Sequence, residues 1–339
     1  MKHFLIYPSP EKDPTGFAHI FRDELRAQGF DETLDFEKAD IIYAFDHPRL
    51  FSKTLFALKS SKAQKVLLRF EPPAVNPILY SKNTLRHYGR VLSIGGTKHL
   101  GVSDQVIHWP YFSHPNPAKP KQDDILESKS ISFSSFDGKK DRRIELSMIV
   151  SNKVAWSKPS NYRLRRNIIL KATNFGLSCY GMGWQSSRLF RLATNLRLYL
   201  FFLSQGRFVN PLHMVENLFF PKQESISAIA NKFDVLTNSD FHLVIENSST
   251  YVSEKLLDAL VAGAVPIYIG PDLKPYGIPA SCVITPKNDI GEVVKTLQNL
   301  KDVDLEAIRE QVSKFMHSDK GLGAWEPSKV AQSIIGICR

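Results

Sequence analysis

A short polar segment in the second half of the chain carries the residue types best suited to binding an anion. It holds Glu246, Asn247, Tyr251, Glu254 and Lys255, and Lys255 follows Tyr251 by one helical turn, so both could face one ligand. A cation near the start of a helix opposes the helix dipole, and a bound diphosphate would compensate for this. A strand-to-helix turn with solvated charges explains the same spacing equally well.

Apolar residues on both sides of this segment have the spacing of two strands and a helix. Residues 241–245 and 265–269 predict buried strands, and residues 251–261 predict a helix that Ser249 or Thr250 would cap. A β-loop-α-β unit of this kind implies parallel strands with a right-handed crossover. Because ligands of open α/β sheets bind beyond the carboxyl ends of the strands, the polar segment lies where a ligand is expected.

A second candidate group, Glu71, follows a strongly apolar strand predicted over residues 65–70. Pro72 and Pro73 restrict the backbone after it, which would hold the carboxylate at the mouth of a cleft. A solvated glutamate paired with Arg69 explains this single residue at least as well.

Basic residues begin a third candidate element, the helix predicted over residues 162–172. Arg163 and Arg165 would oppose the dipole of this helix unless they meet an anion, and either guanidinium group could hold a phosphate through two hydrogen bonds. The strand predicted before this helix ends at Ser151 and Asn152. A solvated basic face is the alternative, because the chain has 44 Lys and Arg residues.

Strands alternate with helices along both halves of the chain, a pattern typical of doubly wound α/β sheets. Residues 1–125 predict a first α/β domain and residues 140–325 a second, with a Pro-, Lys- and Asp-rich linker over residues 115–130. Residues 78–88 predict a helix of the first domain, and residues 326–339 predict a last helix that packs back on the body. The first domain has no glycine-rich dinucleotide motif and no Walker motif, so the second domain is expected to hold the nucleotide.

The charge of the chain favours anionic partners. Its 339 residues include 44 Lys and Arg against 34 Asp and Glu, a formal charge of +10. No zinc-finger spacing, helix-turn-helix signature or RNA-binding motif occurs, so we expect no nucleic-acid partner. The three cysteines have neither metal-binding nor disulfide spacing, and no signal peptide or apolar run of spanning length is present. These features predict a cytoplasmic protein.

The polar segment resembles the donor-binding signature of the family 10 glycosyltransferases, the α1,3/α1,4-fucosyltransferases. The signature stands here as Phe-x-Leu-x-Ile-Glu-Asn-Ser over residues 241–248, Tyr-Val-Ser-Glu-Lys over residues 251–255 and Gly-Ala-Val-Pro over residues 263–266. The Ile replaces a Phe of the family pattern, the Ser of the second block replaces a Thr, and the spacer between the first two blocks is shorter. The chain looks like a bacterial-type, soluble member of this family.

Two other segments support the resemblance. Phe-Glu-Pro-Pro at residues 70–73 is similar to the family segment whose glutamate is the proposed general base, which implies that role for Glu71. Val-Ser-Asn at residues 150–152, followed by Arg-Leu-Arg from Arg163, is similar to the segment that carries the arginine for the donor diphosphate. The resemblance implies a donor-binding set made of Arg163, Ser151, Asn152, Glu246, Asn247, Tyr251, Glu254 and Lys255.

The resemblance further implies a GT-B architecture, in which two Rossmann-like domains face a central cleft. The implied reaction is inverting transfer of L-fucose from GDP-fucose to a glycan hydroxyl group, with α1,3 linkage to a GlcNAc-type sugar of a surface polysaccharide or lipopolysaccharide. No Asp-x-Asp motif lies in the donor segment, so no essential metal is expected, although some family members are stimulated by Mn²⁺. A GT-B transferase for another nucleotide sugar, and a non-catalytic module that binds nucleotides or a membrane surface, remain alternatives.

Arginines alternate with large apolar residues over residues 187–207, where the chain departs most from the family pattern. One interpretation is a basic amphipathic helix that lies on an anionic membrane, peripheral to the inner membrane, with a lipid-linked glycan as acceptor. The other interpretation is an added helix that packs on the core.

Overall fold

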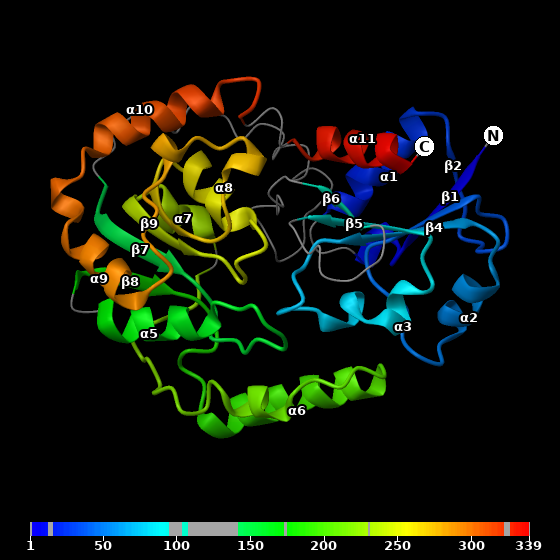
Figure 1. Ribbon diagram of the computed structural model, residues 1–339, viewed down its shortest axis with the longest axis horizontal. Helices are drawn as coiled ribbons and strands as arrows, with labels where there is room; N and C mark the ends of the chain where they lie inside the picture. Colours follow the sequence, from blue (N-terminus) through cyan, green and yellow to red (C-terminus); the bar gives the residue numbers. More distant parts are fainter. Residues whose placement is uncertain are drawn as a thin grey trace.

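The computed structural model describes residues 2–12, 16–94, 104–107, 142–172, 175–229, 231–321 and 326–338. They form two α/β units, each built on its own parallel sheet, and the units lie side by side in Figure 1. The predicted α/β class with two sheets is therefore confirmed. The predicted linker over residues 115–130 lies outside the described residues.

The first unit contains a six-stranded sheet in which every strand pair is parallel. Its strands, in the order β2-β1-β3-β4-β5-β6, are β2 (Asp31–Glu32), β1 (His3–Tyr7), β3 (Ile41–Ala44), β4 (Gln64–Arg69), β5 (Arg90–Ile94) and β6 (Asp104–Ile107). Alternate residues of a strand point to opposite faces, so Phe4 and Ile6 join one apolar cluster and Leu5 joins another. Both faces of the sheet are therefore covered.

Helices α1 (Phe17–Ala27) and α11 (Pro327–Cys338) cover one face, and α2 (Lys53–Ser60) covers the other with the short helices η2 (Pro77–Tyr80) and α3 (Lys82–Leu85). The sequence predicts one helix over residues 78–88, and this prediction is wrong. Ser81 is extended and its side chain accepts a hydrogen bond from the backbone N–H of Thr84, so the chain begins a new helix there.

The last helix, α11, returns to the first unit and packs on α1 (Figure 1). Ile334 and Ile335 are buried in the same cluster as Phe21. The side chain of Gln332 donates a hydrogen bond of 2.8 Å to Glu24. The end of the chain thus stabilises the first unit, although the whole second sheet lies between them in sequence.

The second unit contains a four-stranded parallel sheet in the order β10-β9-β7-β8. Its strands are β7 (Ile144–Ile149), β8 (Leu177–Tyr180), β9 (Ser239–Ile245) and β10 (Val265–Ile269). Its helices are α5 (Tyr162–Ala172), α7 (Lys232–Leu236), α8 (Glu254–Val261), α9 (Ile290–Gln298) and α10 (Leu305–Met316). One apolar cluster lies under α5 and α9 and another under α8 and α10, so this sheet too is covered on both faces.

The β9-α8-β10 unit confirms the predicted pair of parallel strands joined through a helix. Its helix begins later than predicted. The N-cap is Ser253, whose hydroxyl group accepts a hydrogen bond from the backbone N–H of Lys255, and not Ser249 or Thr250. The preceding residues form a loop that buries Tyr251 and Val252, and their burial delays the first helical turn.

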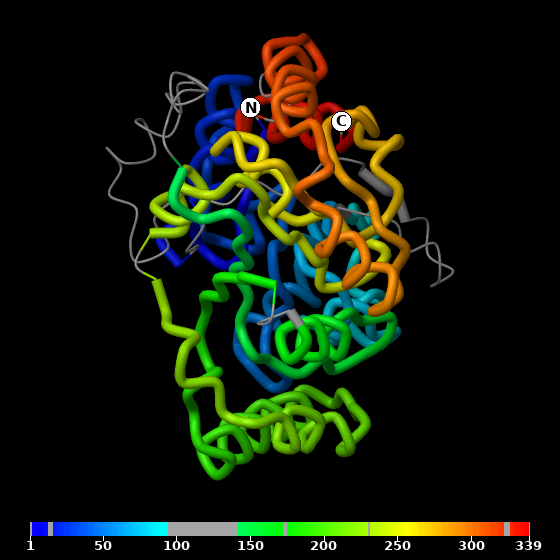
Figure 2. The backbone as a smooth tube through the Cα atoms, turned by 90° about the vertical axis from the view of Figure 1, so that its left-hand side faces the viewer, coloured from blue at the N-terminus to red at the C-terminus, as the bar shows by residue number. Residues whose placement is uncertain are grey.

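Helix α6 (Arg188–Ser204) lies outside both layered units, at the lower edge of the molecule in Figures 1 and 2. It is followed by η5 (Pro211–Val215), which it contacts. Neither α6 nor any other helix in the described part of the chain has the length and apolarity to cross a bilayer.

Candidate active site

A cavity of about 270 Å³ lies between the two units, beyond the carboxyl ends of β7 and β9. The first unit contributes Glu71 and Val75 to its wall. The second unit contributes most of the charged and polar groups, which are those of Ser151, Lys153, Tyr162, Arg165, Lys232, His242, Asn247, Glu254, Lys255 and Asp258. Two segments far apart in sequence, Glu71 and the polar segment after β9, therefore meet at one site.

Direct contacts between the units hold the Glu71 loop in place. The backbone N–H of Trp156 donates a hydrogen bond of 2.9 Å to the carbonyl oxygen of Ala74, and Ala74 is buried against Ala155 and Tyr162. The hydroxyl group of Tyr80 donates a bond of 2.8 Å to the carbonyl oxygen of Glu71 itself. The backbone that carries the carboxylate is thus fixed from both units.

The carboxyl group of Glu71 is a weaker acid than that of an ordinary glutamate. Its side chain remains open to water in the cleft, yet protein surrounds it on several sides. This partial desolvation, together with the negative charge of Glu254, raises the pKa of Glu71 to about 7, against the opposing effect of Lys255 and Lys153. Such a group exchanges a proton readily near neutral pH, as a general base must.

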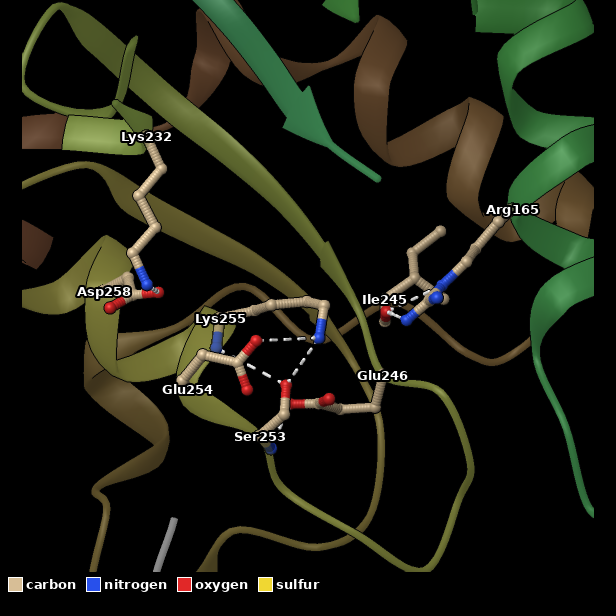
Figure 3. A network of polar contacts seen from close by, with 8 residues as sticks. All are labelled: Arg165, Lys232, Ile245, Glu246, Ser253, Glu254, Lys255 and Asp258. Atoms are coloured by element: carbon tan, nitrogen blue, oxygen red, sulfur yellow. Dashed lines mark hydrogen bonds and ion pairs between the residues drawn. The ribbon is translucent and has the colours of Figure 1, made fainter. Parts of the chain in front are cut away.

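Lys255 brings a positive charge to the cavity wall from the second unit, and Figure 3 shows it beside Glu254 and Ser253. Its Nζ atom lies 3.0 Å from Oγ of Ser253 and 3.3 Å from Oε1 of Glu254. Burial alone would lower the pKa of Lys255, but the neighbouring carboxylates of Glu254 and Glu246 raise it above its ordinary value. The ammonium group therefore stays charged at the beginning of α8.

A second cation, Lys232, joins α7 to α8 (Figure 3). Its Nζ atom lies 2.5 Å from Oδ2 of the buried Asp258. Burial raises the pKa of Asp258 to about 6, and the charge of Lys232 limits this rise. The sequence did not mark Asp258, because its carboxylate stands in the middle of an otherwise apolar helix.

The two arginines at the start of α5 have different surroundings. Arg165 is buried, and its Nε and Nη2 atoms both donate to the carbonyl oxygen of Ile245 at the end of β9, the first at 3.0 Å (Figure 3). Arg163, which the resemblance assigns to the diphosphate, is exposed and does not line the cavity. Its contact with a donor stays a prediction, and Arg165 positions the strand end.

Three predicted donor residues lie behind the cavity wall rather than on it. Glu246 is fully buried, and its Oε1 atom accepts a hydrogen bond of 2.8 Å from the backbone N–H of Ser253. Burial raises the pKa of Glu246. Tyr251 is buried in the same loop, and the amide of Asn152 lies 3.4 Å from the carbonyl oxygen of Gly183. Their positions suit them to hold the loops that carry Ser151, Asn247, Glu254 and Lys255.

Sequence reasoning missed several cavity residues. Lys153 lies in the loop after β7, Tyr162 begins α5 and His242 lies in β9, so no spacing along the chain connects them. His242 interrupts an apolar strand, which was the one available signal. Burial lowers the pKa of His242 to about 3, and its Nδ1 atom lies 2.8 Å from Oγ of Ser147. The ring is therefore neutral.

The described residues contain no group of three or more His, Cys, Asp or Glu placed to hold a metal.

Neither a protein-family model nor a curated protein matches the sequence. The fold has clear counterparts among solved structures. An α1,3-fucosyltransferase, also solved with GDP-fucose, shares 13% identity at a TM-score of 0.53, over 92% of this chain and 81% of that one. HepE of Anabaena, in complex with UDP and glucose, shares 10% identity at 0.52, over 100% and 99%. An α-glucosyltransferase in complex with UDP and DNA shares 11% identity at 0.58, over 98% and 99%. The predicted GT-B fold is confirmed.

Proposed function

We propose that the protein is an inverting glycosyltransferase that transfers L-fucose from GDP-fucose to a hydroxyl group of a glycan. One observation carries this proposal: a carboxyl group with a pKa of about 7 from the first unit faces, across one cavity, the cationic end of α8 in the second. A transferase needs these two parts, because the acceptor must lose a proton while the donor loses a diphosphate.

In this mechanism Glu71 accepts the proton of the acceptor hydroxyl group. The acceptor oxygen attacks the anomeric carbon of the donor from the face opposite the diphosphate, so the new glycosidic bond forms as the bond to the phosphate oxygen breaks. GDP leaves with the bonding electrons and the anomeric configuration inverts. The pKa of about 7 leaves a large share of Glu71 ionised at neutral pH, which is the form that accepts the proton.

The second unit stabilises the departing diphosphate. Lys255, Lys232 and Lys153 line the cavity, and α8 begins at its wall with Glu254 and Lys255, where the positive end of the helix dipole favours an anion. We assign the diphosphate to Lys255 and Arg163, and the ribose, phosphate or fucose to Asn247 and Glu254, while the buried Tyr251 holds the loop that carries them. These cations can neutralise a diphosphate without a metal ion, so the reaction is proposed to need none, with stimulation by Mn²⁺ compatible with it.

The choice of GDP-fucose rests on the motif around residues 246–255 and on the fold shared with an α1,3-fucosyltransferase that was solved with GDP-fucose. A UDP-sugar is the second candidate, because HepE and the α-glucosyltransferase have the same fold and were solved with UDP. For the acceptor we propose a GlcNAc-type sugar of a surface polysaccharide or lipopolysaccharide, joined through an α1,3 linkage. The three cysteines are free thiols, in keeping with a cytoplasmic enzyme.

Calorimetric titration tests the donor. The protein is titrated with GDP-fucose, GDP-mannose and UDP-glucose, and selective binding of GDP-fucose is expected. Lys255→Ala and Arg163→Ala should weaken it about tenfold each, since each removes a charge-assisted contact. Lys171→Ala is the matched control, because Lys171 is an exposed cation in the last turn of α5, whereas Arg163 lies in the first turn next to Tyr162, which lines the cavity. Preferred binding of UDP-glucose would mean that the donor is a UDP-sugar and not GDP-fucose. Equally weak binding of all three nucleotide sugars would remove the transferase assignment.

A further inference from the structure

Helix α6 turns polar side chains toward the protein and most of its large apolar side chains toward solvent. The side chains that it turns toward the body include Arg191 and Asn195, with Phe202 as the buried apolar residue. Most of its large apolar side chains face outward, namely those of Leu189, Phe190, Leu192, Leu196, Leu198, Leu200, Phe201 and Leu203. A surface helix of a globular protein normally shows the opposite arrangement.

Polar contacts, and not the leucines, hold α6 in place. Nη1 of Arg191 donates to the carbonyl oxygens of Asn217 and Phe220 at 3.0 and 2.8 Å, and Nη2 donates to that of Trp184 at 2.9 Å. The amide of Asn195 donates to the carbonyl oxygen of Met214 at 2.7 Å. These contacts, together with Phe202, which packs on Trp156, hold α6 by its polar side and one phenyl ring, and most of its leucines stay exposed.

The apolar surface continues past the end of the helix, where the exposed residues are Phe208, Leu212 and Phe219. It also reaches the first unit. The backbone N–H of Leu50 donates a bond of 3.0 Å to Oε1 of Gln205, and the guanidinium of Arg49 lies over the ring of Phe201. An exposed apolar surface that continues over several elements indicates a binding surface.

Phe51, which follows Leu50, is exposed and has a strained backbone conformation. Its ring is 87% exposed, and its backbone has a φ of 59°, in the left-handed region that bulky residues avoid. Such strain persists where the surrounding structure requires it and clusters at functional positions. The backbone here projects a phenyl ring into the solvent next to α6.

The exposed charges around this surface indicate an anionic partner. Arg188 and Arg197 of α6 and Arg49 of the neighbouring loop are exposed, residues 188–215 and 47–70 contain no Asp or Glu, and the next acid, Glu216, is paired with Arg166. Apolar side chains mixed with arginines match the interface of an anionic bilayer, where the aliphatic parts enter the lipid and the guanidinium groups meet phosphates. A second copy of the chain would place the same positive charges face to face, which disfavours a dimer through this surface.

We propose that α6, the residues after it up to Phe219, and the loop at residues 49–51 form a docking surface for an anionic phospholipid bilayer. The helix has 17 residues and would lie in the plane of the headgroups. Because both units contribute to the surface, a bound bilayer would hold them in one orientation beside the cleft. The inference does not depend on which sugar the site transfers.

Vesicle flotation tests the docking surface. The full chain is floated with vesicles of pure phosphatidylcholine and with vesicles of equal parts phosphatidylglycerol and phosphatidylcholine. Binding is expected only to the anionic vesicles, and high salt should weaken it. The double variant Leu189→Ser and Phe190→Ser should reduce the partition coefficient by at least about tenfold, and Arg197→Gln by about fivefold.

Two matched controls separate the surface from general effects. Leu34→Ser changes a leucine that is as exposed as Leu189, 79% in both cases. Leu34 comes two residues after β2, and Figure 1 shows β2 far from α6. Arg143→Gln removes an exposed arginine that precedes β7. Both controls should float like the wild type. The proposal is overturned if the wild type does not bind anionic vesicles, or if the controls lose binding as much as the α6 variants.

Sedimentation velocity distinguishes the alternative occupant. Without lipid, the wild type and the double variant are both expected to sediment as the same species. If instead the wild type self-associates, the double variant does not, and neither binds vesicles, the face is an interface between copies and the membrane proposal is wrong. Donor titration is measured on the same samples, so failure of the docking surface and failure of the donor site give different results.

Discussion

Helix α8 of the second unit and helix α6, which lies outside both layered units, are both rich in leucine and use their polar residues in opposite ways. In α8 the leucines face the sheet and the cluster under α10, and the charged residues at its start face the cavity. In α6 the polar Arg191 and Asn195 face the body and the leucines face outward. The comparison teaches that two leucine-rich helices can differ in the direction of the apolar face without differing in composition.

The largest expected effect concerns the chemistry that α8 faces. Glu71→Gln removes the proton acceptor and keeps the shape, so kcat should fall about a thousandfold, while binding of GDP-fucose stays close to that of the wild type. Initial rates of fucose transfer and calorimetry measure the two effects, and Glu37→Gln in an exposed loop of the same unit is the control. Rapid transfer by Glu71→Gln would refute its role as the base.

Equivalent leucines in the two helices should differ in their contribution to stability. Leu257→Ala in α8 opens a cavity at a fully buried position and should lower the free energy of unfolding by about 2 to 5 kcal/mol. Leu196→Ala in α6 changes a side chain that is 43% exposed and should cost less than about 0.5 kcal/mol. Urea denaturation measures both values. Equal losses would mean that the face of α6 is covered in solution.

The polar attachment of α6 can be broken by Arg191→Met. This change removes three hydrogen bonds from a buried guanidinium group to carbonyl oxygens, and local stability of the α6 region should fall by about 2 kcal/mol. Hydrogen exchange should accelerate in α6 and η5 but not in α8. Arg197→Met, at an exposed position of the same helix, should leave the exchange rates unchanged. Uniform acceleration across the unit would contradict a local attachment.

The smallest effect is the pH dependence of the reaction. Only the ionised form of Glu71 accepts a proton, and its pKa of about 7 means that the rate should rise about tenfold between pH 6 and pH 8. The raised pKa also makes the ionised form less favourable in the folded protein, so this group's contribution to stability is present below its unfolded pKa and is lost as the pH rises through about 7. Glu71→Gln should flatten the rate profile and remove this loss, as rates and urea midpoints across the pH range would show. A profile that stays steep in Glu71→Gln would assign the titration to another group.

Most elements could be predicted from the sequence because their signals are local. The helix predicted over residues 162–172 agrees with α5, and the strands on either side of the polar segment agree with β9 and β10. The errors occurred where side chains compete with the backbone. Ser81 divides one predicted helix into η2 and α3, and burial of Tyr251 moves the start of α8 to Glu254.

The sequence by itself determined the α/β class, the two sheets, and the residue types of the candidate site, because hydrophobic periodicity and motif spacing are properties of neighbouring residues. Only the tertiary structure decided which groups share the cavity. It joined Glu71 to Lys255, added Lys232 and Asp258, and placed Arg165 on the end of β9. It also decided how α6 is oriented, because a periodic pattern of leucine and arginine is the same whether the helix packs by its apolar side or by its polar one.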